Sequence, residues 1–494
     1  MKIFSIALGQ HDHNTYDGVF HNQIERYSRR KHNVPWHVDV YPHHSEASRM
    51  NWHDARYSTE FYDKYFKPNK YEVLAFTTTS GGIESIPHHQ INQEFLDWKP
   101  KHLWDYKMIG NQYYIDHHQS HAAYALLDSA YHTSDVLAID GKGWNYNCIF
   151  INKDGNITDL SDKMNIGVLW NKLSQKLGFG NLGASKLMGL SAYGKYDIAI
   201  HLAIEDNRIL KNDDYRSSLK KEDIAATLQY HTIDLIKRHV FPLKSCDNIC
   251  IAGGVAYNGY MNEEFTKHYK SVYVPPAPGD EGQALGTYMH AEKMLNYRIH
   301  FPSKYGGKEY EFVGDKKVNL DTLAWELQAG KIVGWFQGKS ESGHRALGNR
   351  SILASPCNPN IKDIINKTIK HREDFRPFAP VILQDHAHWY FDITQPSPYM
   401  SRIVKAKDSA KESIPGVIHV DGTSRIQTVN EQENPKLCKL LQHVYQATGH
   451  PILLNTSFNC REPIVETPEQ AINTFNKTAL DILVINEYYM SKVG

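Results

Sequence analysis

Two stretches of the chain repeat one pattern of apolar and polar residues. Residues 3–8 form an apolar run that predicts a strand, and a polar loop with a hairpin turn at 17–18 follows it. A second apolar run begins at 136, breaks into a loop rich in glycine and aspartate at 140–143, and returns as a strand at 147–150. The repetition predicts a duplicated, two-lobed fold in which a phosphate loop from each lobe faces one cleft.

Apolar spacing predicts further helices and strands along the rest of the chain. Helices are predicted at 223–240, 320–329 and 435–447, and the run rich in alanine and leucine within 114–127 could form another. Strands are predicted at 248–252, 331–336 and 451–454, and a capping box at 467–470 begins another helix. The stretch 302–318 is polar, basic and contains glycine, which predicts a linker between two folded parts.

Length, net charge, apolar runs and cysteine content limit the number of domains and the kinds of partner expected for this protein. A chain of 494 residues is long enough for two or three domains, each with its own core. Its formal net charge is zero, from 55 basic and 55 acidic residues, so no global charge requires a nucleic-acid or membrane partner. No apolar run is long enough to span a bilayer, and the first one is too short for a signal peptide. The six scattered cysteines favour reduced thiols in a cytoplasmic protein.

The first candidate site lies at residues 117–143. His117 and His121 are four residues apart, so a helix would place both imidazoles on one face, at the spacing that grips a metal ion. Asp140 ends the next strand and could be a third ligand, while Gly141 and Gly143 leave backbone amides free for a phosphate. The alternative is a pair of helix-surface histidines and a turn aspartate. The combination of the three features favours a site.

Further along the chain, loops that contain glycine lead into predicted helices. The loop 181–194 carries one lysine, Lys186, and could contact an anion or simply cap a helix. Gly253 and Gly254 stand between a strand and the next helix, an arrangement that binds nucleotides through free amides and the helix dipole. Asp280 stands at another helix start, either as an N-cap or as a metal ligand, and spacing alone favours the cap.

Basic side chains recur in two regions. Between 23 and 107 they alternate with aromatic residues, a pattern that can bind nucleic acid but more often marks a solvated helical face. In the C-terminal part, arginine, lysine, asparagine and serine recur at strand ends within apolar sequence, and buried guanidinium groups need anionic partners. A phosphate-rich, carbamoyl or carboxylate ligand is one candidate partner. Structural pairing with carboxylates is the other, and we expect both; the candidate carboxylates are Glu341, Glu373, Asp374 and Asp421.

Ten short segments in a fixed order resemble the O-carbamoyltransferase family, whose members carbamoylate tobramycin, cephem antibiotics, nodulation factors and ansamycins. The resemblance covers nearly the whole chain. The matching segments are 116–121, 137–143, 187–194, 253–258, 278–282, 345–351, 375–380, 419–423, 455–459 and 462–465.

The resemblance implies an α/β protein with duplicated lobes of the actin-like ATPase superfamily, similar to the enzymes that place threonylcarbamoyl on tRNA, followed by a YrdC-like domain. We therefore expect a carbamoyl-transfer domain at 1–301, a linker at 302–318 and a carbamoyl-adenylate-forming domain at 319–494. In the family, the C-terminal site joins carbamoyl phosphate to ATP and releases pyrophosphate. An acceptor hydroxyl then attacks the carbamoyl adenylate in the N-terminal site, and AMP leaves.

The resemblance also implies roles for individual residues. His117, His121, Asp140 and Asp280 would bind Fe2+ or another divalent metal, which overrides the cap preference for Asp280, and Mg2+ is a further candidate ion. His11 would accept the proton of the acceptor. The nucleotide in the N-terminal site would contact Gly141, Lys142, Gly143, Lys186, Gly253, Gly254, Val255 and Asn258. Carbamoyl phosphate and ATP in the C-terminal site would contact Lys339, Arg345, Arg350, Lys370, Arg372, Arg376, Arg425, Asn455 and Ser457.

The chain departs from the family pattern in two loops. After Asn459 it is one residue short and lacks a glycine, which leaves the role of Arg461 open. The first loop carries His13 and Asn14 where small residues are usual.

Several questions stay open at this point. The acceptor could be a hydroxyl of a small natural product or the hydroxymethyl group of a modified pyrimidine, free or in DNA, and the aromatic-basic stretch favours the nucleotide. No motif sets the oligomeric state. A threonylcarbamoyl-tRNA enzyme or a hydrogenase-maturation carbamoyltransferase is the alternative function. The order of the motifs and the lack of paired CxxC segments argue against it. The intact set of four metal-ligand candidates argues against a nucleotide-binding regulator without activity.

Overall fold

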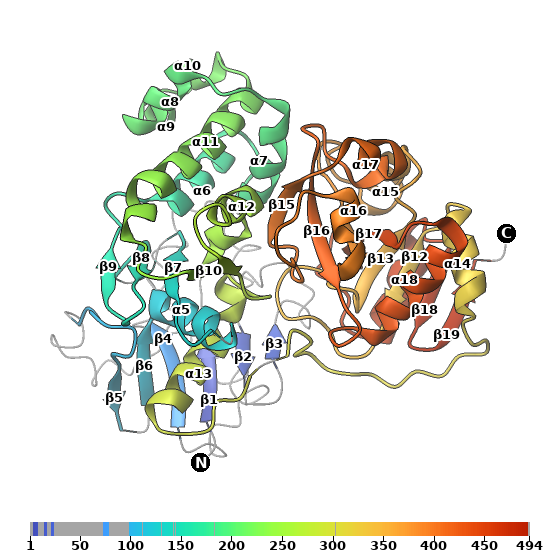
Figure 1. Ribbon diagram of the computed structural model, residues 1–494, viewed down its shortest axis with the longest axis horizontal. Coiled ribbons are helices and arrows are strands. Elements are labelled where there is room, and N and C mark those ends of the chain that lie inside the picture. Colours follow the sequence, from blue (N-terminus) through green and yellow to red (C-terminus); the bar gives the residue numbers. More distant parts are fainter. Residues whose placement is uncertain are drawn as a thin grey trace, which may run out of the picture. The chain divides into compact units, whose positions relative to one another are not determined.

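A computed structural model describes residues 3–7, 14–16, 21–23, 73–78 and 98–492, apart from positions 111, 130, 142, 144, 182 and 302 (Figure 1). The chain forms two compact units, and each is assembled from several segments. The first unit comprises Met1–Asn165, Leu243–Val255 and Tyr273–Gly307. The second comprises Ile166–Pro242, Ala256–Val272 and Lys308–Gly494.

The first unit begins with a six-stranded sheet in the order β3-β2-β1-β4-β6-β5. β1 is antiparallel to β2 and parallel to β4, which is in turn parallel to β6. The strands are β1 (Ile3–Ala7), β2 (Asn14–Tyr16), β3 (His21–Gln23), β4 (Val73–Thr78), β5 (Lys107–Ile109) and β6 (Gln112–Asp116). β2 and β3 form the predicted hairpin, with Tyr16 opposite His21, and its turn at 17–18 lies outside the described residues.

A second sheet repeats this topology. Its strands are β7 (Asp135–Ile139), β8 (Cys148–Ile151), β9 (Ile157–Asp159), β10 (Asn248–Ala252) and β11 (Ser271–Tyr273). The order β11-β10-β7-β8-β9 matches β6-β4-β1-β2-β3 of the first sheet, with β7 antiparallel to β8 and parallel to β10. The duplicated α/β fold predicted from the two strand–loop–strand patterns is therefore confirmed.

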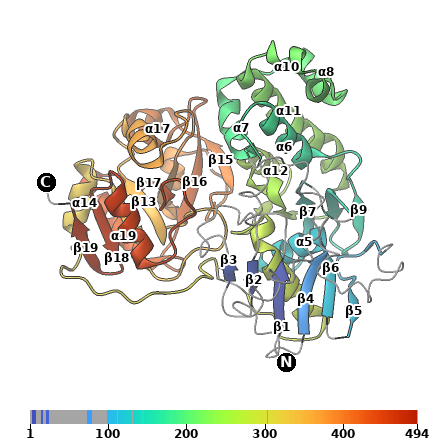
Figure 2. The same ribbon diagram turned by 180° about the vertical axis from the view of Figure 1, so that it is seen from behind.

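Two buried helices of the first unit, α5 (His117–Asp128) and α13 (Gln283–Met294), pack against each other (Figure 1), and Figure 2 shows α5 from behind. The Ser120 hydroxyl donates to the Gln283 carbonyl oxygen over 2.8 Å and lies 3.1 Å from the Thr287 hydroxyl. Apolar side chains of both helices and of β1, β4 and β6 make one core, which fixes the helix start that carries the first candidate site.

The second unit contains a helical part within 166–272. Its helices are α6 (Ile166–Lys176), α7 (Ala184–Leu190), η6 (Ser191–Tyr193), α8 (Ile198–Glu205), α9 (Arg208–Lys211), α10 (Asp213–Ser217), α11 (Lys221–His239), η7 (Phe241–Leu243), η8 (Gly254–Tyr257) and α12 (Gly259–Phe265). The long helix α11, predicted at 223–240, packs against α7 and α8. Its Thr232 hydroxyl accepts a hydrogen bond from the Trp170 indole over 2.9 Å.

The remainder of this unit is built on an eight-stranded sheet in the order β15-β16-β14-β17-β13-β12-β18-β19. The strands are β12 (Val333–Phe336), β13 (Arg350–Ala354), β14 (Ala379–Leu383), β15 (Arg402–Lys405), β16 (Thr423–Val429), β17 (Ile452–Ser457), β18 (Ile482–Ile485) and β19 (Tyr488–Ser491). The helices are α14 (Leu320–Gln328), α15 (Ile361–Ile365), η10 (Asn366–Lys370), η11 (Gln384–His386), α16 (Ala387–Tyr390), α17 (Asp408–Ser413), η12 (Pro415–Val417), α18 (Pro435–Thr448) and α19 (Pro468–Lys477).

Alternate residues of the central strands of this sheet enter two separate cores. Leu353 faces one core with α14 and α18, whereas Ile352 and Ala354 face the other with α15 and α19. The sheet is therefore covered by helices on both faces.

The predicted helices at 320–329 and 435–447 are confirmed as α14 and α18, and the predicted capping box is present at Thr467 and Gln470. The boundaries proposed at 301 and 319 stay a prediction. Among the described residues, no helix combines the length and apolar character needed to cross a bilayer.

Candidate active site

The first candidate site is built on the N-terminus of α5. Asp116 ends β6 and caps this helix, because its carboxylate accepts the backbone N–H of His118 over 2.8 Å. The Gln119 side chain completes the capping box by accepting the N–H of Asp116 over 2.9 Å. This cap fixes where the helix begins, and His117 and His121 then lie one turn apart with their Nε2 atoms 3.2 Å from each other.

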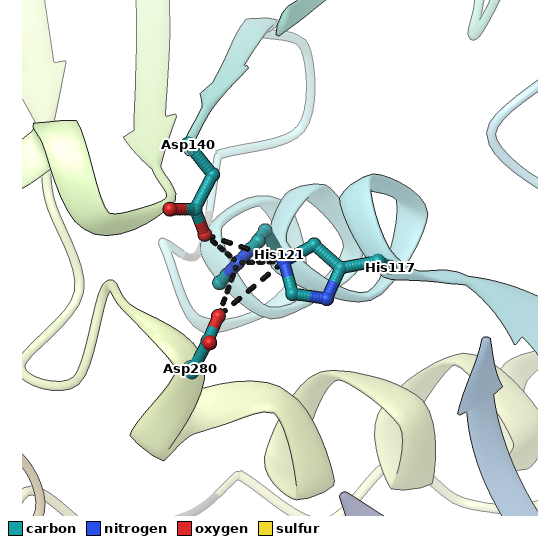
Figure 3. Close-up of side chains that lie close together, drawn as sticks. All are labelled: His117, His121, Asp140 and Asp280. Atoms are coloured by element: carbon teal, nitrogen blue, oxygen red, sulfur yellow. Dashed lines mark hydrogen bonds and ion pairs between the residues drawn. The ribbon is translucent and has the colours of Figure 1, made fainter. Parts of the chain in front are cut away.

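Two aspartates from distant segments meet this histidine pair (Figure 3). Asp140 directly follows β7, and its Oδ2 lies 2.9 Å from Nε2 of His121 and 3.3 Å from Nε2 of His117. Asp280 begins the short helix η9 (Asp280–Gly282), and its Oδ1 lies 3.3 Å from Nε2 of His117 and 3.4 Å from Nε2 of His121. Asp280 does not cap that helix, whose N-cap is Gly279, so the cap favoured by spacing is wrong.

The spacing of these donor atoms fits a bound metal ion. Ligands about 2.0–2.1 Å from a tetrahedral ion lie about 3.3 Å from one another, and most of the distances above are close to this value. Two imidazoles and two carboxylates suit Fe2+, Zn2+ and similar divalent ions. His117, His121, Asp140 and Asp280 are therefore brought together as a group that could hold one metal ion.

The electrostatics of the group favour added positive charge. Burial lowers the pKa of His117, but Asp280 and Asp140 outweigh it and raise this pKa to about 10. Burial and Asp140 raise the pKa of Asp280, but the two histidines lower it to about 2. The two carboxylates thus make a pocket that attracts cations, either protons on the imidazoles or a metal ion.

Glycines allow the elements that carry the ligands to approach closely. A Cβ atom at Gly286 of α13 would lie 2.0 Å from the carbonyl oxygen of Ser120 in α5. A Cβ at Gly254 would lie 2.9 Å from Oδ1 of Asp140, and one at Gly253, where φ is +89°, would lie 2.2 Å from the Ile139 carbonyl oxygen. The sequence predicted Gly253 and Gly254 as nucleotide contacts, and the structure puts both beside Asp140.

The backbone amides of Gly141 and Gly143, expected to be free for a phosphate, are hydrogen-bonded within their own loop. The Gly141 amide donates to Oδ1 of Asp140 over 2.6 Å, and the Gly143 amide donates to the Tyr146 carbonyl oxygen over 2.9 Å. The expectation of two free amides is therefore wrong, because the loop uses both to hold its own shape. Asn145 ties this loop to the start of α5 by donating to Oδ2 of Asp116 over 3.1 Å.

Other residues predicted for the N-terminal site have partners of their own or lie outside the described part of the chain. Lys186 forms an ion pair with Oε1 of Glu373 at 2.9 Å. Asn258 caps α12 through Met261 and donates to the Gln229 side chain over 2.9 Å. His11 and Lys142 fall outside the described residues.

The second unit contains a cluster of four of the predicted arginines. Burial lowers the pKa of Arg425 on β16 well below its usual value, and Arg345, Arg372 and Arg376 lower it further. Burial, followed by Arg376, lowers the pKa of Arg372 to about 9. The Nε atom of Arg425 is buried and has no hydrogen-bond partner within the described residues.

The carboxylates expected to pair with the arginines have several kinds of partner. Glu373 lies 3.8 Å from Arg376, which confirms one of the expected structural pairs. Glu341 instead accepts backbone N–H groups of Leu347, Asn349 and Arg350 over 2.8–3.0 Å. Asp421 accepts the Tyr260 hydroxyl over 2.7 Å. The arrangement leaves a locally positive site suited to a phosphate or another anion.

The remaining predicted C-terminal residues shape the surrounding loops. The Arg350 guanidinium donates to the carbonyl oxygens of Gln337 and Gly338 and stacks 3.6 Å from the ring centroid of Phe336. Asn455 donates to the Ala346 carbonyl oxygen and to the Gln427 side chain. Lys339 is exposed.

Lys370 is another of the residues predicted for the C-terminal site. Its ammonium donates to Oδ1 of Asn459 over 2.6 Å and lies 3.2 Å from the Ser457 hydroxyl. The loop that is one residue short after Asn459 is thus tied to η10.

Sequence reasoning missed the supporting residues Asn145 and Gly286. An isolated glycine within the apolar pattern of a helix, as at 286, is the signal that could have indicated a close helix contact.

Comparisons with known proteins show the family to which the chain belongs. The family model described as "Carbamoyltransferase N-terminus" matches residues 44–221 and 199–289, and "Carbamoyltransferase C-terminus" matches 324–492. The chain is 31% identical to nodulation protein NolO of Bradyrhizobium diazoefficiens, over 76% of this chain and 79% of that protein. It is 33% identical to the uncharacterized protein MJ1051 of Methanocaldococcus jannaschii, over 77% of this chain and 83% of that protein.

A solved structure of HypF from T. kodakarensis is also similar, with 11% identity, a TM-score of 0.35, and coverage of 60% of this chain and 48% of that one. The two family matches together span most of the sequence, including the metal-ligand group and the arginine cluster. The chain is therefore a member of the carbamoyltransferase family and an enzyme of the transferase class.

Proposed function

We propose that this enzyme makes carbamoyl adenylate from ATP and carbamoyl phosphate and transfers the carbamoyl group to an acceptor hydroxyl. The observation that carries the proposal is the arginine cluster of Arg345, Arg372, Arg376 and Arg425. The positive charges of Arg345, Arg372 and Arg376 lower the pKa of Arg425, and Arg376 lies 3.8 Å from Glu373. A substrate rich in phosphate would offset the repulsion between these charges.

In this C-terminal site the four arginines bind and orient the phosphates. Water first cleaves carbamoyl phosphate into carbamate and inorganic phosphate. An oxygen of the carbamate then forms a bond to the α-phosphorus of ATP, and pyrophosphate leaves with the electron pair of the broken P–O bond. Arginine side chains nearby offset the negative charge that develops on the phosphoryl oxygens. The carbamoyl phosphate must also lose its own phosphate, so the site has to accommodate several anionic groups, and a set of four cations supports this.

The N-terminal site carries the transfer step. His117, His121, Asp140 and Asp280 would hold a divalent ion, which supplies a Lewis acid for the adenylate phosphate when it is bound. The acceptor oxygen forms a bond to the carbamoyl carbon while the bond from that carbon to the phosphate oxygen breaks, and AMP leaves. His11 is proposed to take the hydroxyl proton. Gly253, Gly254 and Val255, at the end of β10, are proposed to line the nucleotide site.

The acceptor is proposed to be a hydroxyl of a small natural product or the hydroxymethyl group of a modified pyrimidine. A gel shift with hydroxymethylated DNA at increasing salt separates the two classes, because phosphate contacts weaken steeply with salt. No shift at low salt would eliminate the DNA acceptor. A mass-spectrometric search for a carbamoyl increment on candidate acceptors identifies the compound itself.

Partial reactions test the division of labour between the two sites. Replacing both His117 and His121 with alanine should abolish transfer but leave pyrophosphate release that depends on carbamoyl phosphate. Arg425→Gln should abolish both carbamoyl transfer and pyrophosphate release. His132→Ala, at an exposed position, is the matched control and should leave both steps unchanged. Loss of pyrophosphate release in the double histidine variant would contradict the proposal.

A further inference from the structure

Helices α8 and α11 bring together a second group of metal-type ligands. His201 and Glu205 lie one turn apart on α8, and His231 and Asp234 lie three residues apart on α11. One donor atom from each lies within 4.8 Å of all the others. We propose that these four residues form a second site for a divalent transition metal ion of the zinc type. Facing side chains on packed helices are a common way to build such sites.

The distances between the donor atoms support this site. Nδ1 of His231 lies 3.4 Å from Nε2 of His201, which lies 3.5 Å from Oε1 of Glu205. These separations exceed those of good hydrogen bonds and approach the roughly 3.3 Å expected between ligands of a tetrahedral ion. A metal ion between the atoms therefore accounts for the spacing better than direct hydrogen bonds do.

The two imidazoles are buried, so leaving their ring nitrogens without a ligand or a hydrogen-bond partner costs free energy. Both histidines are 6% exposed, so each imidazole is largely removed from water.

Aromatic rings cover the group from one side. Tyr196 and Tyr230 lie 4.3 Å apart, and each ring centroid is 5.8 Å from that of His201. Both tyrosines remain partly exposed, at 44% and 49%. They shield the imidazoles from bulk water while leaving a short path for an ion.

Arg238 provides the competing explanation. Its guanidinium lies 2.6 Å from Asp234 and 3.1 Å from Glu205. On its own, that pairing would make the cluster a salt-bridged link between α8 and α11. In the proposed site, Arg238 lowers the affinity for a cation by sharing the two carboxylates, so a change at this residue distinguishes the two explanations.

Metal stoichiometry tests the proposal. The full-length protein is stripped with a chelator and titrated with Co2+, and the bound metal is measured by absorbance and by elemental analysis. His201→Ala with His231→Ala should bind one equivalent less than the unchanged protein. The variant lacking His117 and His121 should retain that equivalent. Equal stoichiometry with and without His201 and His231 would overturn the proposal, whatever the outcome for carbamoyl transfer.

Two milder variants keep the test valid if the double histidine variant does not fold. Glu205→Gln, at a partly exposed side chain, should lower Co2+ affinity for this site at least tenfold with an unchanged circular dichroism spectrum. Arg238→Gln should raise the affinity severalfold, because it frees both carboxylates. A salt-bridged link without metal predicts lower stability and no change in Co2+ binding for both variants, and that result would also overturn the proposal.

Discussion

Gly286 of α13 lies so close to Ser120 of α5 that a Cβ atom at position 286 would stand 2.0 Å from the Ser120 carbonyl oxygen. Ser120 precedes the proposed metal ligand His121, and Gly286 follows the short helix that begins with Asp280. The contact between the two helices therefore controls the distance between the histidine pair and one of its carboxylates.

Gly286→Ala should separate α5 from α13. Overpacking of a buried contact costs about 1–3 kcal/mol, which exceeds the gain in helix propensity from alanine. We expect lower stability in urea denaturation and weaker metal binding. Gly141→Ala is the matched control, since a Cβ there meets nothing within 4 Å, and its effect on stability should stay within about 0.5 kcal/mol. Equal effects of both substitutions would refute this account.

Asp280→Asn should weaken the metal site without changing its shape. The amide keeps the size of the carboxylate but removes its charge, and Asp280 is the strongest of the groups that raise the pKa of His117. We expect a loss of at least tenfold in divalent metal affinity, or about 1.4 kcal/mol, in competition with a coloured chelator. The exposed control Asp154→Asn should bind metal normally.

Arg425→Gln should stabilise the protein in the absence of anions. It removes one member of a partly buried group of like charges, so the melting temperature should rise by a few degrees. Pyrophosphate should stabilise the unchanged protein much more than the variant, because binding to the folded state raises stability by mass action. Differential scanning calorimetry with and without pyrophosphate measures both effects.

The control for this experiment is Arg208→Gln, at a side chain that is half exposed and pairs with Asp206. It should change neither the melting temperature nor its response to pyrophosphate. A variant at Arg425 that is less stable, yet responds fully to pyrophosphate, would show that Arg425 has a structural role.

Asp128, at the end of α5, should make stability depend on pH. Burial raises its pKa to about 7, although a short hydrogen bond from Tyr273 opposes this. The unfolded value is about 3.9, so the contribution of the protonated carboxyl is complete below about pH 4 and is lost as the pH rises through 7.

Compared with Asp128→Asn, the unchanged protein should lose up to about 1.4 kcal/mol per pH unit between these limits. Urea denaturation of both proteins at several pH values gives the difference. A difference that stays constant from pH 5 to pH 8 would contradict the assignment.

Local patterns predicted the elements of the first site well. The spacing of His117 and His121 indicates one helix face, and the apolar run before Asp140 indicates a strand end, because both signals depend on neighbouring residues only. The role of Asp280 could not be derived in this way. Its spacing suits an N-cap, and its position beside the histidines depends on the packing of helices that are about 160 residues apart in the chain.

Arg350 and Arg425 also show that local sequence does not determine which groups a side chain contacts in the fold. The sequence alone does not distinguish Arg350 from Arg425, since both lie next to apolar residues at predicted strand ends. In the fold, main-chain carbonyl oxygens of one loop take up the Arg350 guanidinium, whereas the neighbours of Arg425 are other arginines. The second ligand group, on α8 and α11, had a helical signal at His201 and Glu205, but only packing brings His231 beside it.

The order of the chain has a consequence for synthesis on the ribosome. Asp140 and the histidine pair are made early, but Asp280 follows them only after the inserted helical segment that ends at Pro242. Chains fold as they emerge, at about 5–20 residues per second, so the nascent first unit must wait several seconds for its last ligand. Until then a metal ion would meet an incomplete coordination shell, and loading should occur late, once α13 has docked.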